Sequence, residues 1–246
     1  MSMAGKRVLV TGGGSGAGAS LALGFAATGA SVIICGRRIE ALERTASMHG
    51  AILAIACDVS DEQSVIDLYR QSGGIDIVIA NAGQSDSAAF TKTTLAQWNT
   101  MLAVNLTGVF LTFREGLRQM PAWGRLIAVC STAGLKGYAR VAPYAAGKHG
   151  VVGLTRSLAL EVARTPVTVN AICPGFLDTD MTAQSIRHIV EKTGRSETEA
   201  RVALEAFNPQ KRLITPDEVT AAALWLCGPG SEGINGQAIA ISGGEV

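Results

Sequence analysis

Short apolar runs alternate with amphipathic segments along the whole of this 246-residue chain. Seven runs have the length and residue types of β-strands, and they cover residues 7–10, 31–35, 52–56, 75–80, 126–130, 168–173 and 237–241. Most are continuously apolar, as expected for parallel strands that are buried on both faces. The segments between them, such as 95–120 and 143–164, have helical spacing. This alternation predicts an α/β fold: a doubly wound seven-stranded parallel sheet with helices on both faces.

Composition is compatible with one large core and excludes several classes of protein. The chain is 48% hydrophobic, and it contains no low-complexity linker, internal repeat or break in composition. We therefore expect a single domain over residues 1–246. A net charge of +1 gives no reason to expect a nucleic acid or an anionic membrane as partner. No apolar run approaches the ~18 residues that a membrane-spanning helix needs.

Cysteine and histidine positions indicate neither a disulfide framework nor a metal site. The five cysteines are scattered without CxxC spacing, and the three histidines form no ligand pattern. We expect buried, reduced thiols and no metal. The first residues lack the features of a secretory signal, so we expect a cytoplasmic protein.

A glycine-rich turn follows the first predicted strand and opens a helix-like segment. It begins at Gly12 and continues through Ser15 and Gly16 to Ala17 and Gly18. Glycines at such a turn let the backbone approach a pyrophosphate, whose charge then meets the helix N-terminus. The GxGxxG pattern is met only in its GxGxxA form, and a plain turn between two core elements is the alternative. The strand–loop–helix context favours dinucleotide binding.

Tyr144 and Lys148 are four residues apart in a predicted helix, and Ser131 precedes the tyrosine by thirteen residues. Residues at this helical spacing share one face. A free tyrosine has a pKa of about 10, and a nearby ammonium group favours its phenolate form. Such a pair is suited to general acid–base catalysis. The alternative is a solvated helix face, because the spacing alone is common.

Further polar residues follow other predicted strands. Asp58, Asn81 and Ser131 each stand at or just beyond the carboxyl end of a strand. Ligands of doubly wound sheets bind at that edge. The sequence therefore predicts one site that combines these residues with the glycine-rich turn.

Taken together, the motifs resemble the short-chain dehydrogenase/reductase family, in its single-domain branch of about this length. The resemblance extends from Lys6 to Gly244. The matching elements, in family order, are Thr11-Gly12-x-x-x-Gly16-x-Gly18, Asp58-Val59, Asn81-Ala82-Gly83, the set Asn105, Ser131, Tyr144 and Lys148, and Pro174-Gly175 with Thr179. Ala80 departs from the pattern, since an asparagine is more usual there.

The resemblance implies a Rossmann-like fold, an NAD(P)(H)-dependent oxidoreductase acting on CH–OH groups, and a homotetramer. It implies that Tyr144 exchanges a proton with the carbonyl oxygen, that Lys148 assists Tyr144 and bonds the nicotinamide ribose, and that Ser131 donates a hydrogen bond to the substrate. Asn105 would hold a water that links Lys148 to solvent. The residues expected to bind the cofactor are Gly12, Ser15, Gly16, Ala17, Gly18, Arg37, Arg38, Asp58, Val59, Asn81, Ala82, Gly83, Tyr144, Lys148, Pro174, Gly175, Leu177 and Thr179.

The end of the second predicted strand bears on cofactor choice. An acidic residue there would accept hydrogen bonds from the free ribose of NAD(H), but the chain has Gly36 followed by Arg37 and Arg38. A guanidinium group can bind a phosphate through two hydrogen bonds. We therefore favour NADP(H), and NAD(H) stays possible. The alternative is that these arginines begin a solvated helix and pair with Glu40 or Glu43.

The segment from about 180 to 215 is expected to form a helical lid over a small-molecule carbonyl or alcohol substrate. Its apolar residues recur at roughly helical spacing, and its acidic and basic residues balance. The chain resembles family members that act on 3-oxoacyl or 3-hydroxyacyl thioesters and on polyketide-type ketones. Two alternatives stay open: a catalytically silent nucleotide-sensing protein, and an alcohol dehydrogenase for an unrelated small substrate.

Overall fold

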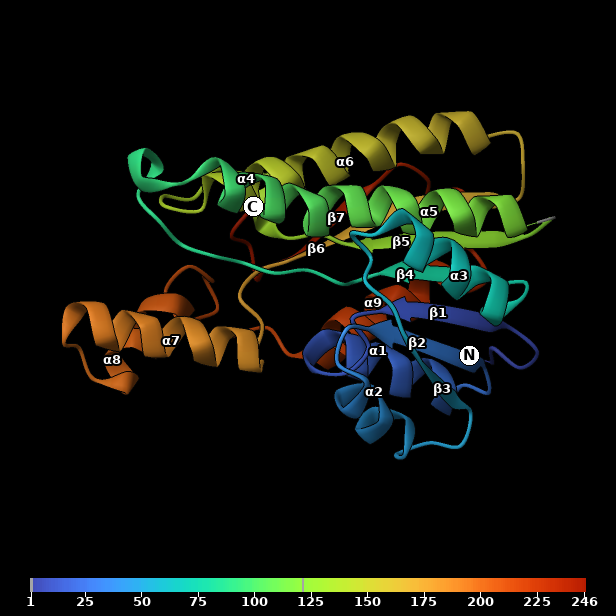
Figure 1. The fold of residues 1–246 in the computed structure, drawn as a ribbon, viewed down its shortest axis with the longest axis horizontal. Helices are drawn as coiled ribbons and strands as arrows, with labels where there is room; N and C mark the ends of the chain where they lie inside the picture. The colour runs from blue at the N-terminus through green and yellow to red at the C-terminus, as the bar shows by residue number, and fades with distance from the viewer. Residues whose placement is uncertain (1, 121) are drawn as a thin grey trace.

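The computed structural model describes residues 2–120 and 122–246, and a parallel β-sheet lies at its centre (Figure 1). In this part of the chain the sheet has seven strands in the order β3-β2-β1-β4-β5-β6-β7, all in parallel pairs. The strands are β1 (Arg7–Thr11), β2 (Ser31–Gly36), β3 (Ile52–Ala56), β4 (Ile77–Ala80), β5 (Gly124–Val129), β6 (Val167–Pro174) and β7 (Ala238–Ile241). The predicted doubly wound α/β fold is confirmed.

Helices cover both faces of the sheet (Figure 1). One layer contains α3 (Glu62–Ser72), α5 (Gly108–Gln119) and α6 (Ala142–Val162), and the other contains α1 (Gly16–Ala27), α2 (Ile39–Ala46) and α9 (Pro216–Cys227). Successive strand residues point to opposite faces: Leu9 and Val78 enter one apolar cluster, whereas Val8 and Ile77 enter the other. Both faces are thus buried, which explains the continuously apolar strands.

The predicted helix over 95–120 is interrupted, which corrects the expectation of one regular helix. It consists of α4 (Leu95–Leu102), a π-helical turn η2 (Ala103–Thr107) and α5. Single π-helical turns are frequent at functional sites, because the wider turn redirects the side chains that it carries. Here the turn contains Asn105, one of the predicted catalytic residues.

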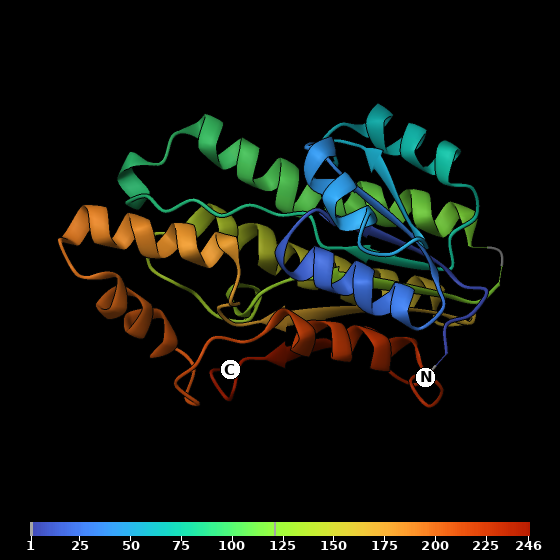
Figure 2. The ribbon, with the colours of Figure 1, turned by 90° about the horizontal axis from the view of Figure 1, so that it is seen from below.

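Two further helices project from the body and form the segment predicted as a lid (Figure 2). They are α7 (Asp180–Thr193) and α8 (Glu197–Glu205). They share a small apolar cluster of their own, which contains Ile186, Leu204 and Leu213. The short 3₁₀ turns η1 (Phe90–Lys92) and η3 (Thr132–Gly134) complete the elements.

Strand ends differ from the sequence expectation by one or two residues, because pairing partners decide where a ladder begins. The run 75–80 pairs only from Ile77, and β5 begins at Gly124 because Gly124 is opposite Val167. The expectation of one domain over residues 1–246 stays a prediction, and residues 1 and 121 lie outside the described part. Among the described residues, every helix is too short or too polar to span a bilayer.

Candidate active site

The backbone of the glycine-rich turn between β1 and α1 leaves room only for very small side chains at several positions. Gly12 and Gly16 have φ angles of 68° and 53°, in the left-handed region that favours glycine. A Cβ atom added to Gly18 would lie 2.1 Å from the Gly12 carbonyl oxygen, closer than any real contact. The turn is therefore held tightly against the first turn of α1.

The N-terminus of α1 has the features of an anion site. Ser15 is its N-cap residue but forms no side-chain cap, and the first turn contains no acidic residue. The N–H groups of the first turn lack partners within the helix, and the helix dipole adds partial positive charge. These features fit the pyrophosphate of a dinucleotide. Thr179 closes the other side, since a Cβ on Gly16 would lie 3.2 Å from its Cγ2 atom.

Thr11 connects the glycine-rich turn to the end of β4. Its hydroxyl oxygen accepts hydrogen bonds from the backbone N–H groups of Asn81 (3.0 Å) and Ala82 (2.9 Å). The Asn81 side chain returns a hydrogen bond to the Thr11 carbonyl oxygen at 2.9 Å. Thr11 was not among the residues predicted to bind the cofactor, although it is the first residue of the matched motif in the glycine-rich turn.

Asn105 is fully buried and ties its π-helical turn to the segment after β4. Its Nδ2 atom donates to the carbonyl oxygens of Gln84 (2.9 Å) and Met101 (3.0 Å), and its Oδ1 atom accepts from the Gln84 N–H group (3.2 Å). A Cβ on Gly83 would lie 2.9 Å from Asn105 Oδ1 and 3.8 Å from Lys148 Nζ. Gly83 therefore lets the Asn81–Gly83 segment approach both predicted catalytic residues.

Lys148 and Tyr144 lie together near the N-terminal end of α6. The Lys148 Nζ atom is 5.6 Å from the centre of the Tyr144 ring and donates a hydrogen bond to the Val129 carbonyl oxygen at 2.9 Å. Lys148 is buried, whereas Tyr144 is only partly covered. The two side chains thus lie near each other, as their helical spacing predicts. Their catalytic roles stay predictions.

Ser131 is the first residue after Cys130 at the end of β5 and caps the turn η3, with its Oγ atom accepting from the Ala133 N–H group at 3.1 Å. A Cβ on Gly134 would lie 2.8 Å from the Lys148 carbonyl oxygen. The turn that begins at Ser131 therefore packs directly against α6, on the same edge of the sheet as the glycine-rich turn.

A second tyrosine, Tyr138, lies in the same region but in a different environment. Its hydroxyl group donates to Glu245 and lies 2.6 Å from Thr132 Oγ1. Burial raises the pKa of Tyr138, and the hydrogen bond to the Glu245 carboxylate raises it further. Tyr138 thus stays protonated at neutral pH, and its proton is already engaged. This leaves Tyr144 as the tyrosine available for proton transfer.

The end of β2 carries two exposed arginines, Arg37 and Arg38. No carboxylate in the described part of the chain lies within salt-bridge distance of either, so the alternative pairing with Glu40 or Glu43 is not observed. Nearby Asp58 accepts hydrogen bonds from Ser60, which lower the pKa of its carboxyl group, and the positive charge of Arg37 lowers it further. Asp58 and Arg37 therefore lie at one end of the candidate site.

The remaining predicted cofactor residues line the same edge. Ala17 and Val59 are buried, the latter against Gly108. Gly175 follows β6 and donates its N–H group to the Ile241 carbonyl oxygen at 3.0 Å. Leu177 pairs with Ile214 in an isolated parallel bridge, and Thr179 is the N-cap residue of α7. Pro174, the last residue of β6, pairs with Ile241 of β7.

Aromatic side chains connect the lid to the body. Phe207 is one of the apolar lid residues whose helical spacing predicted either a substrate cleft or helix packing, whereas Tyr138 and Phe176 were not predicted. Tyr138, Phe176 and Phe207 come from the loop after η3, the loop after β6 and the end of α8. Their ring centres are 5.4–6.4 Å apart. They form an aromatic cluster that adjoins the turn beginning at Ser131, because the Tyr138 hydroxyl lies 2.6 Å from Thr132 Oγ1. No motif or periodicity indicated Tyr138 or Phe176, because each belongs to a different segment.

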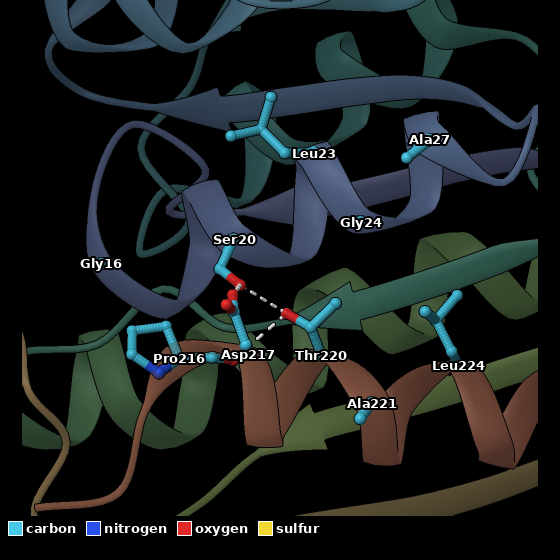
Figure 3. A pocket seen from close by; sticks show the side chains of 10 residues that line it. All are labelled: Gly16, Ser20, Leu23, Gly24, Ala27, Pro216, Asp217, Thr220, Ala221 and Leu224. Carbon is cyan, nitrogen blue, oxygen red and sulfur yellow. Dashed lines mark hydrogen bonds between the residues drawn. The ribbon is translucent and has the colours of Figure 1, made fainter.

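A shallow groove of about 680 Å³ lies elsewhere, between α1 and α9 (Figure 3). Ser20 there hydrogen bonds with Asp217 (2.8 Å) and Thr220 (2.7 Å). A Cβ on Gly24 would lie 2.3 Å from Thr220 Cγ2, so the two helices are in close contact. The groove is a seam of helix packing away from the predicted catalytic residues. Within residues 2–120 and 122–246, no group of three potential metal ligands is present.

Comparisons with known proteins agree with this geometry. A family model described as short chain dehydrogenase matches residues 6–189. A putative ketoacyl reductase of Streptomyces coelicolor is 35% identical, over 96% of this chain and 95% of its own length. A D-beta-hydroxybutyrate dehydrogenase of Cupriavidus necator is 36% identical over 98% of both chains. A crystal structure of a variant actinorhodin polyketide ketoreductase with NADPH has a TM-score of 0.92 at 33% identity, and the match covers 100% of this chain and 99% of that one.

Proposed function

Because this chain belongs to the short-chain dehydrogenase family, we propose that its substrate is a ketone with a bulky apolar body, such as a 3-oxoacyl thioester or a polyketide-type ketone. As a member of that family it is an oxidoreductase that interconverts a ketone and a secondary alcohol with a nicotinamide cofactor. The observation that carries the proposal is the aromatic cluster of Tyr138, Phe176 and Phe207, which adjoins the turn beginning at Ser131 through the hydrogen bond between Tyr138 and Thr132. Relatives named ketoacyl reductase support the same class.

In the proposed mechanism, Tyr144 and Ser131 act on the substrate oxygen, and Lys148 acts on Tyr144. The nicotinamide cofactor supplies the hydride in reduction and accepts it in oxidation. The Tyr144 hydroxyl gives its proton to the carbonyl oxygen in reduction and takes it back in oxidation. Ser131 donates a hydrogen bond to that oxygen and stabilises the negative charge that develops there. The Lys148 ammonium favours the phenolate of Tyr144 once the proton has left.

Asn105 has a supporting role in this proposal. Its amide group is satisfied by Gln84 and Met101, so it holds the π-helical turn and the segment after β4 in register. Lys148 Nζ and Asn105 Oδ1 both lie close to Gly83, at 3.8 Å and 2.9 Å from the position that a Cβ would take there. A water between Asn105 and Lys148 would complete a route for protons to solvent, as the resemblance implies.

Cofactor preference is part of the proposal, and we infer NADP(H). Arg37 and Arg38 are exposed and engage no carboxylate among the described residues, so both guanidinium groups are available for a 2′-phosphate. The similar ketoreductase structure contains NADPH. We also propose that the protein is cytoplasmic, because its five cysteines are buried free thiols.

A substrate panel tests the proposal. Purified protein is offered a 3-oxoacyl thioester, a bicyclic ketone, 3-hydroxybutyrate and a small alcohol, each with NADP(H) and with NAD(H), and turnover is read at the nicotinamide absorbance. We expect the highest kcat/KM for the bulky ketones with NADPH. Preference for 3-hydroxybutyrate or the small alcohol would contradict the substrate class. Cofactor binding without turnover of any compound would favour the nucleotide-sensing alternative.

A further inference from the structure

The C-terminal tail turns back into the body after β7. Ser242 is buried, and Gly243 and Gly244 have φ angles of 61° and 96°, which favour glycine. A Cβ on Gly243 would lie 1.9 Å from Asn208 Oδ1, so the tail is pressed against the segment that follows α8 (Figure 2). The two glycines allow a tight reversal, and the reversal directs the side chain of Glu245 inward.

Glu245 has a buried carboxylate in an unusual place, one residue from the end of the chain. Its side chain is 2% exposed. The Oε1 atom accepts from the Tyr138 hydroxyl group and from Lys136 Nζ, the latter at 3.0 Å. The Oε2 atom has no hydrogen-bond partner in the described part of the chain, and a Cβ on Gly175 would lie 3.3 Å from it. The carboxylate therefore lies between the turn after Ser131 and the loop after β6.

Tyr138 connects this carboxylate to the turn that begins at Ser131 and to the aromatic residues Phe176 and Phe207. Since its single hydroxyl proton is donated to Glu245, the Thr132 hydroxyl must donate to the Tyr138 oxygen. The Tyr138 side chain is thus held by hydrogen bonds at its hydroxyl group and by contacts of its ring with Phe176 and Phe207. Thr132 is the residue after Ser131, so the chain of contacts leads directly to a predicted catalytic group.

A purely structural role does not require a charge here. Burying the Glu245 carboxylate costs free energy of folding, which Lys136 and the Tyr138 hydroxyl group only partly offset. An apolar side chain of similar size at such a position often leaves the folded protein equally or more stable. The lid already has its own apolar cluster around Ile186 and Leu204. What an apolar residue could not provide is a directional acceptor that fixes the Tyr138 hydroxyl.

We propose that Glu245 is a positioning residue for the ketone substrate, which acts by holding Tyr138 in place as the wall between the Ser131 turn and the lid. The inference rests on the proposed function and goes beyond it, because it assigns the segment Gly243-Gly244-Glu245 a part in substrate affinity. The chemistry at Tyr144 and Lys148 does not pass through Glu245. Its loss therefore affects KM more than kcat.

A double-mutant cycle tests this inference. Glu245→Gln, Tyr138→Phe and the double variant are compared for kcat and KM toward the best bulky ketone of the panel, with cofactor affinity measured by nicotinamide fluorescence. Each single variant is expected to raise KM by up to about tenfold, with kcat changed by less than about threefold, because Glu245→Gln removes the charge of the acceptor and Tyr138→Phe removes the donor of one charge-assisted hydrogen bond. Since both changes act on the same hydrogen bond, the double variant should be no worse than Tyr138→Phe alone. Cofactor affinity should not change.

Glu43→Gln is the matched control, because Glu43 is an exposed glutamate of α2, outside the lid, and forms no ion pair among the described residues; its KM should equal that of the wild type. Unchanged KM in Glu245→Gln, or effects that add in the double variant, would overturn the role of Glu245. If Glu245→Gln does not fold, Tyr138→Phe must still raise KM, and a normal KM there overturns the inference. Absence of ketone turnover by the wild type overturns the proposed function and this inference together.

Discussion

Two tyrosines lie near the turn that begins at Ser131, and their surroundings give them different roles. Burial, and after it the hydrogen bond that Tyr138 donates to the Glu245 carboxylate, raise the pKa of Tyr138. Tyr144 is partly accessible and lies next to the buried ammonium group of Lys148. Residue type alone does not separate them. The difference comes from their surroundings, because Tyr138 is hydrogen-bonded to the Glu245 carboxylate whereas Tyr144 lies beside the Lys148 ammonium group.

We expect Tyr144→Phe to lose at least ~10²-fold in kcat, because it removes the transferable proton and little else. Affinity for the reduced cofactor, measured by fluorescence titration, should stay within a factor of a few. Near wild-type turnover in this variant would refute the catalytic assignment. Loss of cofactor binding would instead indicate a disturbed fold.

A second prediction at the residue scale concerns Arg37. If it binds the 2′-phosphate, Arg37→Ala should weaken NADPH binding by roughly 1.5–3 kcal/mol, or about one to two decades, and leave NADH nearly unchanged. Gly36→Asp should act in the same direction, because an acidic residue repels the phosphate. Arg44→Ala, an exposed arginine further along α2, is the matched control. Equal effects on both cofactors, or a wild type that prefers NADH, would exclude the NADP(H) assignment.

At the scale of elements, hydrogen bonds between neighbouring strands bring the turns of the site together. Thr11 connects β1 to the segment after β4, and Asn105 connects the π-helical turn to the same segment. Both side chains are almost fully buried. Loss of either would leave backbone groups without partners in a poorly hydrated place, which is costly.

Thr11→Val tests this connection, since valine has nearly the same shape but no hydroxyl group. Two backbone donors would lose their acceptor, and each such loss costs about 1–3 kcal/mol of unfolding free energy. Thr11→Ser keeps the oxygen and should be much closer to the wild type. Urea unfolding at a fixed protein concentration, with an unchanged m-value, measures the difference. Equal stability of the valine and serine variants would show that the hydroxyl is dispensable.

The start of α9 allows a prediction about pH. Glu218 accepts two hydrogen bonds from Arg212 at 2.7 Å and one from the Thr215 N–H group at 2.8 Å, and these lower its pKa to about 2. A lowered folded-state pKa stabilises the protein above the unfolded value of about 4.3, and that contribution is lost as pH falls toward 2. Glu218→Gln should therefore lower Tm at pH 7, modestly because the pair is partly exposed. The difference from the wild type should shrink between pH 4.5 and pH 2, and a constant difference would contradict the assignment.

At the scale of the whole molecule, one face carries apolar side chains that nothing covers in the described monomer. Leu95 of α4, Phe110 of α5 and Leu160 of α6 are 72%, 43% and 80% exposed. These three helices lie together on one side of the sheet (Figure 1). An interface between identical chains would bury such side chains, and closed symmetry is the usual outcome between identical chains.

We therefore predict a homotetramer, to be measured by light scattering at micromolar concentration. Phe110→Glu should shift the population toward smaller species, because it places a charge in the buried interface. Met48→Glu is the matched control, since Met48 is 67% exposed and follows α2 on the opposite layer. A wild type that stays monomeric would refute the prediction.

Short-range patterns were enough to predict the fold class and to propose most of the site. Continuous apolar runs indicated strands buried on both faces, and the glycines of the first turn indicated a close backbone approach. The helical spacing of Tyr144 and Lys148 indicated a shared pocket. Each of these inferences depends on residues that are close in sequence, and local backbone geometry is determined by such neighbours. The residue roles stay predictions that the variants above address.

Only the tertiary structure decided how distant segments meet. The π-helical turn at Asn105, the double hydrogen bond to Thr11, and the approach of Glu245 to Tyr138 each join residues from separate elements. Sequence periodicity contains no information about such pairs, because the order of strands and the folding back of the tail determine which groups become neighbours. Glu245 is the clearest case: charged residues are mostly exposed, yet two glycines with positive φ and the packing of residue 243 against Asn208 bury the Glu245 side chain beside Tyr138.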